Sequence, residues 1–219
     1  MLDIRREGPV AVLHWDDGEN RFNPSSVAAW HQHLDDLEAT EGPLAVVLVG
    51  EGRFFSNGLD LDWMGAHRDE AGALVEGVHG VFRRVLGLDA LTVAAVNGHC
   101  FAAGAMLATC FDTIVMRADR GFWCLPEADL GLPLTEGMFA LLHAKLPARA
   151  AQEAILTARR FGGTAAAELG LVHEAVPEDE VLARAVEIAT ELAGKSRSVT
   201  AVHKRQLYGK ALDVLAAGA

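Results

Sequence analysis

The sequence predicts an α/β protein in which short apolar strands alternate with helices. Leu44–Val49 reads L-A-V-V-L-V, a continuous apolar run typical of a strand covered on both faces. Residues 24–38 repeat apolar side chains every three or four positions, which indicates a helix facing a core. In Leu91–Phe111 the first part has the composition of a strand, and the second part is rich in residues that favour helix. These three stretches predict the class.

The stretch Leu91–Phe111 contains no Asp, Glu, Lys or Arg, so a hydropathy window would select it as a membrane span. The pair Asn97-Gly98 in its middle is a strong turn signal. We therefore predict a buried strand over 92–96, a turn, and a buried helix over 101–111. Small residues open that helix (Ala102-Ala103-Gly104), which lets a ligand approach the backbone and the free N–H groups of the first turn.

The remaining elements follow in chain order. A strand over 9–15 ends at a turn, and the first helix begins at Asn23-Pro24-Ser25-Ser26, where Asn or Ser is a good cap. Residues 54–61 form a loop, and a glycine-rich helical segment runs over 67–89. Further helices are expected over 138–142, 150–156, from a Thr164 cap to Leu169, over 182–192 and over 196–216.

Composition limits the classes of function. The 219 residues suit one compact domain, and a hydrophobic fraction of 51% is enough for a large core. Thirty acidic residues against nineteen Lys and Arg give a net charge of −11, which argues against nucleic acid and an anionic membrane as partners. Cys100, Cys110 and Cys124 form no C-x-x-C pair and lie in apolar surroundings, so we predict buried, reduced thiols and no metal site. No signal-peptide-like run precedes Asp3, which favours a cytoplasmic protein.

Two motifs carry a resemblance to a known family. The central stretch reads V-N-G-x-x-x-A-A-G-x-x-L and is followed by Cys-Phe-Asp and by Leu-Pro-Glu; Phe54–Leu61 reads F-F-S-N-G-L-D-L. Together, in this order and at this spacing, they resemble the crotonase superfamily of enoyl-CoA hydratases and isomerases. A third match is Gly170–Pro177, and the resemblance covers roughly residues 8–205. It implies the crotonase-type superhelix of strand, strand, helix turns.

The resemblance also implies a site for an acyl-CoA thioester. In the family, two backbone N–H groups bind the thioester oxygen, and the matching positions are Leu59 and Ala103. The loop before the first helix supplies a cation to the CoA phosphates, which makes Arg21 a candidate, although a solvated surface Arg is an equally good interpretation. The loop residues Ser56, Asn57, Gly58 and Asp60 are the expected substrate or CoA contacts. We interpret Asp60 as structural, bonding the loop backbone, rather than as a catalytic acid.

The carboxylates separate the possible reactions. Family hydratases use two glutamates; Met106 stands where the first is usual, and Glu127 matches the second. Met106 cannot hold a water by charge but can pack against an acyl chain. Moving a double bond from position 3 to position 2 needs one group that removes a proton from carbon 2 and returns it to carbon 4. The pattern therefore favours a 3,2-enoyl-CoA isomerase with Glu127 as acid and base.

Two alternatives stay open. Glu136 opens the next apolar helix; it is either a capping acid or a second acid at the pocket, in which case the protein is an enoyl-CoA hydratase. A non-catalytic acyl-CoA-binding homologue is the other possibility, although the retained Pro126-Glu127 argues against it. Lys204 on the last helix is a possible CoA contact, but a solvated helix face is the simpler interpretation.

The organisation implied by the family completes the prediction. Residues 1–163 are expected to form the spiral core, and residues 164–219 a helical region that completes the site and makes contacts in a trimer or a dimer of trimers. No cofactor is expected, since CoA is part of the substrate.

Overall fold

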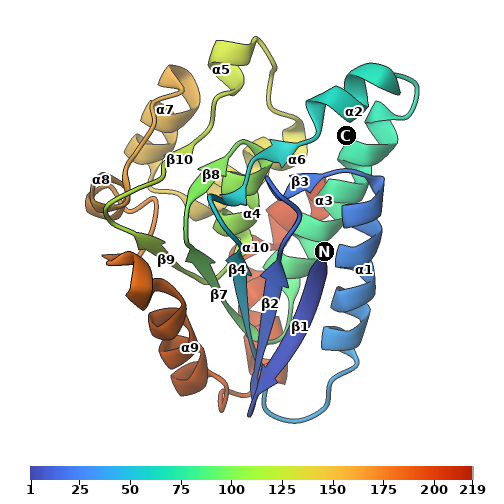
Figure 1. Cartoon of the computed structure of the whole chain (residues 1–219). Coiled ribbons are helices and arrows are strands. Elements are labelled where there is room, and N and C mark those ends of the chain that lie inside the picture. Colours follow the sequence, from blue (N-terminus) through green and yellow to red (C-terminus); the bar gives the residue numbers. More distant parts are fainter. Residues whose placement is uncertain (219) are drawn as a thin grey trace.

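The computed structural model describes residues 1–218 and is built around one sheet of six strands (Figure 1). The strand order is β1-β2-β4-β7-β9-β11, with β1 antiparallel to β2 and every other pair parallel. The strands are β1 (Leu2–Glu7), β2 (Val10–Trp15), β4 (Ala45–Gly50), β7 (Leu91–Val96), β9 (Thr113–Arg117) and β11 (Glu174–Val176). The predicted runs at 9–15, 44–49 and 92–96 are thus strands, side by side at the centre.

Two small parallel sheets continue from the carboxyl ends of these strands. The first has the order β10-β8-β5, with β5 (Phe54–Ser56), β8 (His99–Phe101) and β10 (Trp123–Cys124). The second pairs β3 (Arg21–Phe22) with β6 (Gly58–Leu59). Strands β4, β7 and β9 are each followed by a strand of the first small sheet and then by helix. This repeated strand, strand, helix turn is the predicted crotonase-type α/β fold.

Helices cover both faces of the main sheet. Helix α9 lies alone on one face, where Val12, Val47, Val93 and Val115 meet its apolar side. The opposite face packs against α1, α3, α4, α6 and α10 in the larger core. The helices are α1 (Pro24–Glu38), α2 (Leu61–Ala66), α3 (Ala71–Gly87), α4 (Ala103–Cys110), α5 (Glu127–Leu130), α6 (Glu136–Lys145), α7 (Ala148–Thr157), α8 (Gly163–Glu168), α9 (Val181–Leu192) and α10 (Arg197–Ala216).

The apolar stretch 91–111 is not one helix. It divides at the predicted Asn97-Gly98 turn into β7 and α4, with a short strand, β8, between them that was not predicted; every residue of α4 is buried. A helix buried on all sides has no polar face, which explains its composition. Within residues 1–218, no helix is long and apolar enough to cross a membrane.

Two details differ from the sequence prediction. The helical segment expected at 67–89 is divided: a short helix α2 begins earlier, at Leu61, and α3 begins at Ala71. Thr164 is not a cap, because Gly162 takes the extended N-cap conformation and α8 begins at Gly163. The earlier start is possible because Gly163 packs directly against the Arg117 carbonyl, where a Cβ atom would lie 2.2 Å from the oxygen.

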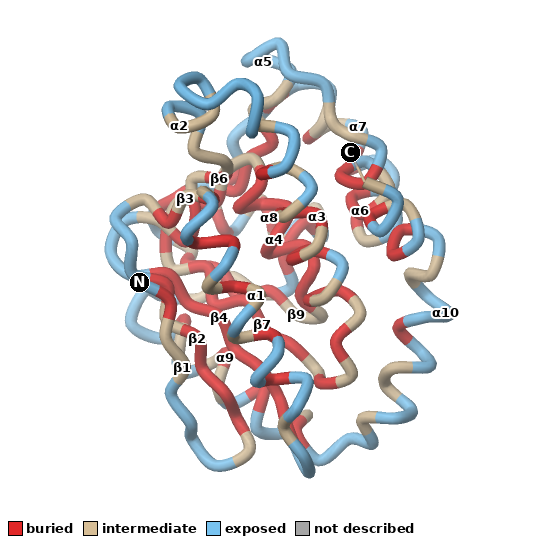
Figure 2. The backbone as a smooth tube through the Cα atoms, turned by 90° about the vertical axis from the view of Figure 1, so that its right-hand side faces the viewer, coloured by how far each residue is buried: buried red, intermediate tan, exposed pale blue. Residues whose placement is uncertain are grey.

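The segment after residue 163 contributes to the sheet as well as to the helical layer. Strand β11 extends the main sheet beside β9, and α10 packs against α3 and α6. The division into two regions at residue 163 stays a prediction. Figure 2 shows α2 and α5 as mostly exposed segments at the same end of the molecule, above the buried core.

Candidate active site

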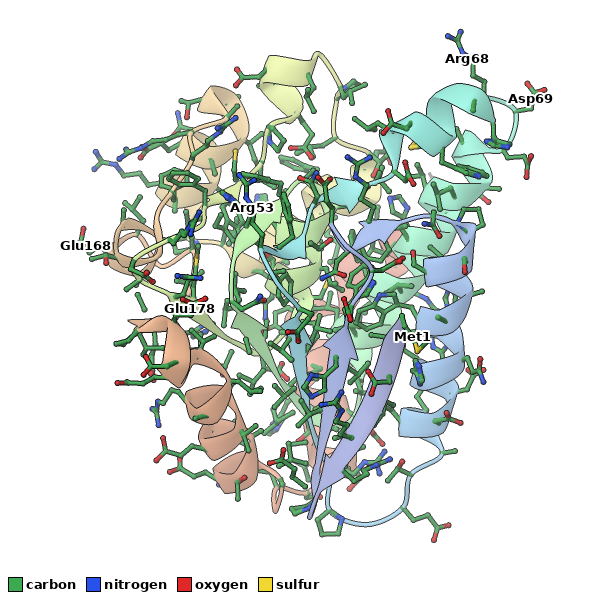
Figure 3. All side chains as sticks on the ribbon, in the orientation of Figure 1. Met1, Arg53, Arg68, Asp69, Glu168 and Glu178 are labelled. Atoms are coloured by element: carbon green, nitrogen blue, oxygen red, sulfur yellow. The ribbon has the colours of Figure 1, made fainter. Side chains whose placement is uncertain are left out.

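A cavity of about 610 Å³, the main cavity, opens at the end of the molecule that carries α2 and α5. Its walls are mostly apolar and include Leu61, Met64, Val75, Leu130, Leu132 and Met138. In Figure 3, Arg68 and Asp69, beyond α2, project into solvent at this end. A cavity with apolar walls and few polar groups suits a ligand with an aliphatic part.

Glu127 is the carboxylate of the main cavity whose environment is most unusual. It is the first residue of α5, shortly after β10 and directly after Pro126, and it is half-buried. Its Oε2 atom is buried and has no hydrogen-bond partner among residues 1–218. Burial raises the pKa of the Glu127 carboxyl, and a hydrogen bond from its own backbone N–H offsets part of that rise. A carboxyl of this kind can both accept and return a proton near neutral pH.

The loop between β5 and β6 touches the start of α4. Gly58 has φ +83°, a conformation that side-chain-bearing residues rarely adopt. A Cβ atom there would lie 2.9 Å from the Ala102 Cβ and 3.1 Å from the Ala103 nitrogen. Gly58 itself does not line the main cavity. Its missing side chain lets the two loops meet, so that Leu59 and Ala103 line one cavity.

The backbone at the start of α4 is strained. Ala102 has φ +50° and ψ −125°, which costs about 1–3 kcal/mol for a residue with a side chain. Its own N–H donates to the Cys124 carbonyl at 3.0 Å, and its carbonyl accepts the Met106 N–H at 3.1 Å. This conformation fixes Ala103 as the first residue of α4, where the N–H has no helical acceptor.

The Leu59 N–H points away from the neighbouring strand. The next residue, Asp60, donates its N–H to the Phe22 carbonyl of β3 at 2.9 Å. Because successive N–H groups of a strand point to opposite sides, the Leu59 N–H is directed away from β3. Leu59 and Ala103, the two residues that carry these donors, both line the main cavity.

Carboxylates surround Arg21. Its guanidinium forms ion pairs with Glu19 at 2.7 Å and Asp62 at 2.8 Å, and Asp60 lies at 3.7 Å. The hydrogen bonds that Arg21 donates to Asp62 and to Glu19, in that order of effect, raise the pKa of Arg21. Asn57 also donates to Glu19 and, like Arg21, lines the main cavity. The charge of Arg21 is thus already neutralised, which weakens the predicted contact with a phosphate.

Asp60 has the structural role expected of it. It is the N-cap of α2 and accepts the Trp63 N–H at 3.0 Å. It does not line the main cavity.

Ser56 and Met106 differ from the expected ligand contacts, because both are fully buried outside the cavity lining. The Ser56 hydroxyl donates to the Asn20 carbonyl at 2.7 Å, and Ser56 packs against Gly104, where a Cβ would lie 2.4 Å from its carbonyl oxygen. Met106 is part of the core around α4. In this structure Met106 fills the interior and does not meet an acyl chain.

Glu136 lies at a second hollow of about 590 Å³, the side cavity, which shares Glu127, Leu132, Pro133 and Thr135 with the main cavity. The Glu136 carboxylate is exposed at the start of α6, and the cap of that helix is Thr135, not Glu136. The structure therefore brings Glu127 and Glu136 to the lining of one hollow.

The three cysteines are buried, as predicted. Cys124 lines the main cavity, and burial raises its pKa to about 11. A thiol that stays protonated is a poor nucleophile, so Cys124 is not a candidate for nucleophilic chemistry.

Arg160 is a candidate that sequence reasoning missed. It lines the main cavity, with its guanidinium carbon 5.7 Å from the centre of the Phe101 ring. Over residues 1–218 it has no ion-pair partner. It follows Arg159, which pairs with Glu153 at 2.5 Å. Arg159 and Arg160 are adjacent in the sequence and of the same residue type, so only the fold shows which of them lines the main cavity.

Lys204 is neither a solvated residue nor a ligand contact. Its side chain is 3% exposed, and the ammonium group lies 2.7 Å from Asp112 Oδ2 and 2.9 Å from the Ala90 carbonyl. Burial lowers the pKa of Lys204, while Asp112 raises it. Both predictions for Lys204 were wrong, because α10 turns this residue inward against the base of the sheet.

Comparison with known proteins identifies the family. Residues 5–218 match the family model of enoyl-CoA hydratase/isomerase. The chain is 34% identical to enoyl-CoA delta isomerase 2, peroxisomal, of Arabidopsis thaliana, covering 98% of this chain and 95% of that protein. It is 36% identical to a putative enoyl-CoA hydratase of Thermus thermophilus, covering 88% of this chain and 78% of that protein.

Among solved structures, an apo enoyl-CoA isomerase of Mycobacterium tuberculosis superposes with a TM-score of 0.91 at 27% identity, covering 99% of this chain and 95% of that one. The similar proteins carry both isomerase and hydratase names. The shared chemistry is that of enoyl-CoA esters.

Proposed function

Because the chain belongs to the enoyl-CoA hydratase/isomerase family, we propose that it shifts the double bond of a 3-enoyl-CoA to position 2, with Glu127 as the one acid and base. The observation that carries this proposal is the half-buried Glu127 carboxyl in the main cavity, whose buried Oε2 atom has no partner among residues 1–218 and whose pKa is raised. The isomerase names of similar proteins support the same direction.

The backbone donors of Leu59 and Ala103 supply the electrostatic part of the reaction. A thioester oxygen between them gains negative charge when carbon 2 loses a proton, so the two N–H groups stabilise the dienolate more than the ester. One donor of this kind is worth about 3 kcal/mol in the transition state. Two observations support this role: the strained backbone of Ala102, and the missing side chain of Gly58, which lets the two segments meet.

Glu127 then acts twice. Its carboxylate removes the proton from carbon 2, the pair of electrons moves into the dienolate, and the same proton returns to carbon 4. The double bond ends between carbons 2 and 3, and no water is consumed. Apolar walls keep the carboxyl basic between the two transfers. Met106 carries no charge and lies in the core, so it takes no part.

The CoA moiety needs a cation, and Arg160 is the better candidate than Arg21. Arg160 borders the main cavity without a carboxylate partner, whereas three carboxylates surround Arg21. The association of three or six copies and a cytoplasmic location stay predictions.

A second candidate function is hydration of a 2-enoyl-CoA. The observation that favours it is the presence of Glu136 with Glu127 in the lining of the side cavity. In that mechanism the two carboxylates would orient and deprotonate a water while a proton is delivered to carbon 2.

A paired assay on the purified protein and the Glu127→Gln and Glu136→Gln variants separates these functions. One reaction contains a 3-enoyl-CoA and is followed for 2-enoyl product; the other contains a 2-enoyl-CoA and is followed for hydration. Isomerisation that is lost in Glu127→Gln and retained in Glu136→Gln supports the proposal. Hydration at a comparable rate, lost in either variant, supports the second candidate. Binding of CoA esters without either reaction would contradict both.

A further inference from the structure

A fully buried histidine lies directly behind the cavity wall and has no part in the mechanism above. His79, on α3, places its Nε2 atom 2.9 Å from the Thr135 Oγ1 atom. Thr135 lines both the main and the side cavity, together with Glu127. The His79 ring is held closely: a Cβ atom on Gly137 would lie 3.1 Å from its Cε1 atom.

The surroundings of His79 fix which ring nitrogen carries the proton. Burial lowers the pKa of His79, so the ring is neutral and one nitrogen is a donor. Its Nδ1 atom is buried and has no partner within residues 1–218. A buried N–H without an acceptor is rarer and more costly than an unfilled acceptor. The proton therefore belongs on Nε2, which donates to Thr135.

This assignment determines the direction of the Thr135 hydroxyl. The oxygen accepts two hydrogen bonds, one from His79 Nε2 and one from the Met138 N–H at 3.2 Å. A hydroxyl oxygen has two acceptor positions and one hydrogen. Because both acceptor positions of the Thr135 oxygen are filled, its hydroxyl hydrogen is free to be donated. That hydrogen has no acceptor in the described part of the chain. Since Thr135 borders both cavities, a ligand is the available acceptor.

We propose that Thr135, held by His79, donates a hydrogen bond to an oxygen atom beside Glu127. That oxygen is a hydroxyl group on the acyl chain of the ligand, so the site prefers a 3-hydroxyacyl-CoA over the saturated ester of equal length. A bound water in the same place is the other outcome that the test distinguishes. His79 is a positioning residue and Thr135 is the specificity-determining one. The proposal rests on the proposed acyl-CoA function.

The test is calorimetric binding of 3-hydroxybutanoyl-CoA and butanoyl-CoA to the full chain, in a Glu127→Gln background that blocks turnover. We expect the hydroxy ester to bind more tightly, by the about three- to tenfold that one neutral hydrogen bond contributes. Adding Thr135→Val removes the hydroxyl and should abolish the preference. Thr135→Ser keeps the hydroxyl and should retain it.

A matched pair at His79 separates positioning from packing. His79→Gln keeps a donor near the place of Nε2 and should retain the preference, whereas His79→Phe keeps the ring volume and should lose it. Because each result is a ratio of two dissociation constants, a general loss of affinity from the missing α6 cap in Thr135→Val does not affect it. A melting curve identifies any variant that fails to fold, and Thr135→Ser with His79→Gln then carry the test.

The source of the oxygen follows from a second ratio, hydration of a 2-enoyl-CoA against isomerisation of a 3-enoyl-CoA, measured with Glu127 present. If this ratio falls from the parent protein through Thr135→Ser to Thr135→Val, the oxygen belongs to a bound water. If the ratio is unchanged while the binding preference is lost, the oxygen is the acyl hydroxyl. Equal affinity of the two esters for the parent protein would overturn this inference and leave the isomerase proposal standing. Failure of either ester to bind would overturn both.

Discussion

The Lys204 ammonium lies 2.7 Å from the Asp112 carboxylate in the interior, where α10 crosses the base of the main sheet. Asp112 also accepts the Thr92 N–H and the Thr92 hydroxyl, each at 2.9 Å, and Lys204 donates to the Ala90 carbonyl. One buried ion pair thus joins the start of β7, the start of β9 and α10. Its role is to hold the C-terminal helix on the core.

The first prediction concerns this pair. Lys204→Met should lower the free energy of unfolding by about 3–5 kcal/mol, because it leaves the Asp112 carboxylate buried without its counter-charge. Urea denaturation measures the change. Lys210→Met, an exposed position on the same helix, is the matched control and should change stability by less than about 0.5 kcal/mol. Equal effects of the two substitutions would show that the pair contributes nothing specific.

Glu127→Gln should reduce kcat of isomerisation by about 10²–10⁴-fold, because the amide can neither accept nor return the proton. In the parent protein kcat/KM should rise with pH through the pKa of Glu127, which burial places above the ordinary 4.5 of a glutamate. A pH–rate profile measures this. An acid limb at or below the ordinary glutamate value would contradict a raised pKa.

The same substitution should stabilise the protein near neutral pH. A carboxyl with a raised pKa in the folded state favours folding most below pH 4.5, and this contribution is lost as pH rises through the folded pKa. Glutamine does not ionise, so its contribution to stability does not fall as pH rises. The melting temperature of Glu127→Gln should therefore exceed that of the parent, and the difference should grow as pH rises through the folded-state pKa of Glu127. The gain corresponds to about 1 kcal/mol for each unit of pKa shift. Melting curves with a constant difference at all pH values would refute it.

Gly58→Ala should cost at least about 100-fold in kcat, because the new Cβ meets the Ala102 Cβ and the Ala103 nitrogen and pushes the two donors apart. The control is Gly8→Ala in the turn between β1 and β2. Gly8 also has a positive φ, +59°, but has no atom within 4 Å of the added Cβ. Gly8→Ala should therefore lower stability by about 1 kcal/mol and leave kcat unchanged. Loss of stability alone in both variants would argue against the role of Gly58.

Arg160→Gln should weaken the binding of free CoA by about three- to tenfold at low salt, and the difference should shrink at high salt, since an exposed ion pair is screened. Arg159→Gln is the control, because Arg159 is engaged with Glu153 and the ring of Phe161. Calorimetric titration at two ionic strengths measures both. If Arg21→Gln has the larger effect, the earlier expectation for Arg21 is restored.

Motifs that depend on backbone geometry could be predicted from the sequence. Gly58 and the Asn97-Gly98 pair indicated special backbone, and the structure gives the physical reason for both. Gly98 packs so closely against the turn before β5 that a Cβ would lie 2.2 Å from the Arg53 carbonyl oxygen. Asn97 bonds the backbone of Gly50 and Gly52 across the same corner. Where two backbone segments approach closely, the position requires glycine, and that glycine can be recognised in a single sequence.

The roles of individual charged side chains were harder to predict. Arg21 and Lys204 were expected to be free cations, and both are held by carboxylates. Arg160 was overlooked beside an equivalent Arg159. The sequence shows the charge of a side chain, but it does not show the ion-pair partner when the two residues lie far apart along the chain. Lys204 and Asp112, for example, meet only after the sheet and α10 have formed.

The sequence by itself determined the fold class and the family, because alternating apolar runs and closely spaced backbone motifs are local properties of the chain. Only the tertiary structure decided which groups face the cavity. It turned Met106 and Ser56 into the core, brought Glu136 to the side of Glu127, and placed His79 behind Thr135. These outcomes depend on contacts between α3, α4 and α6, whose residues are distant in sequence and adjacent only through packing.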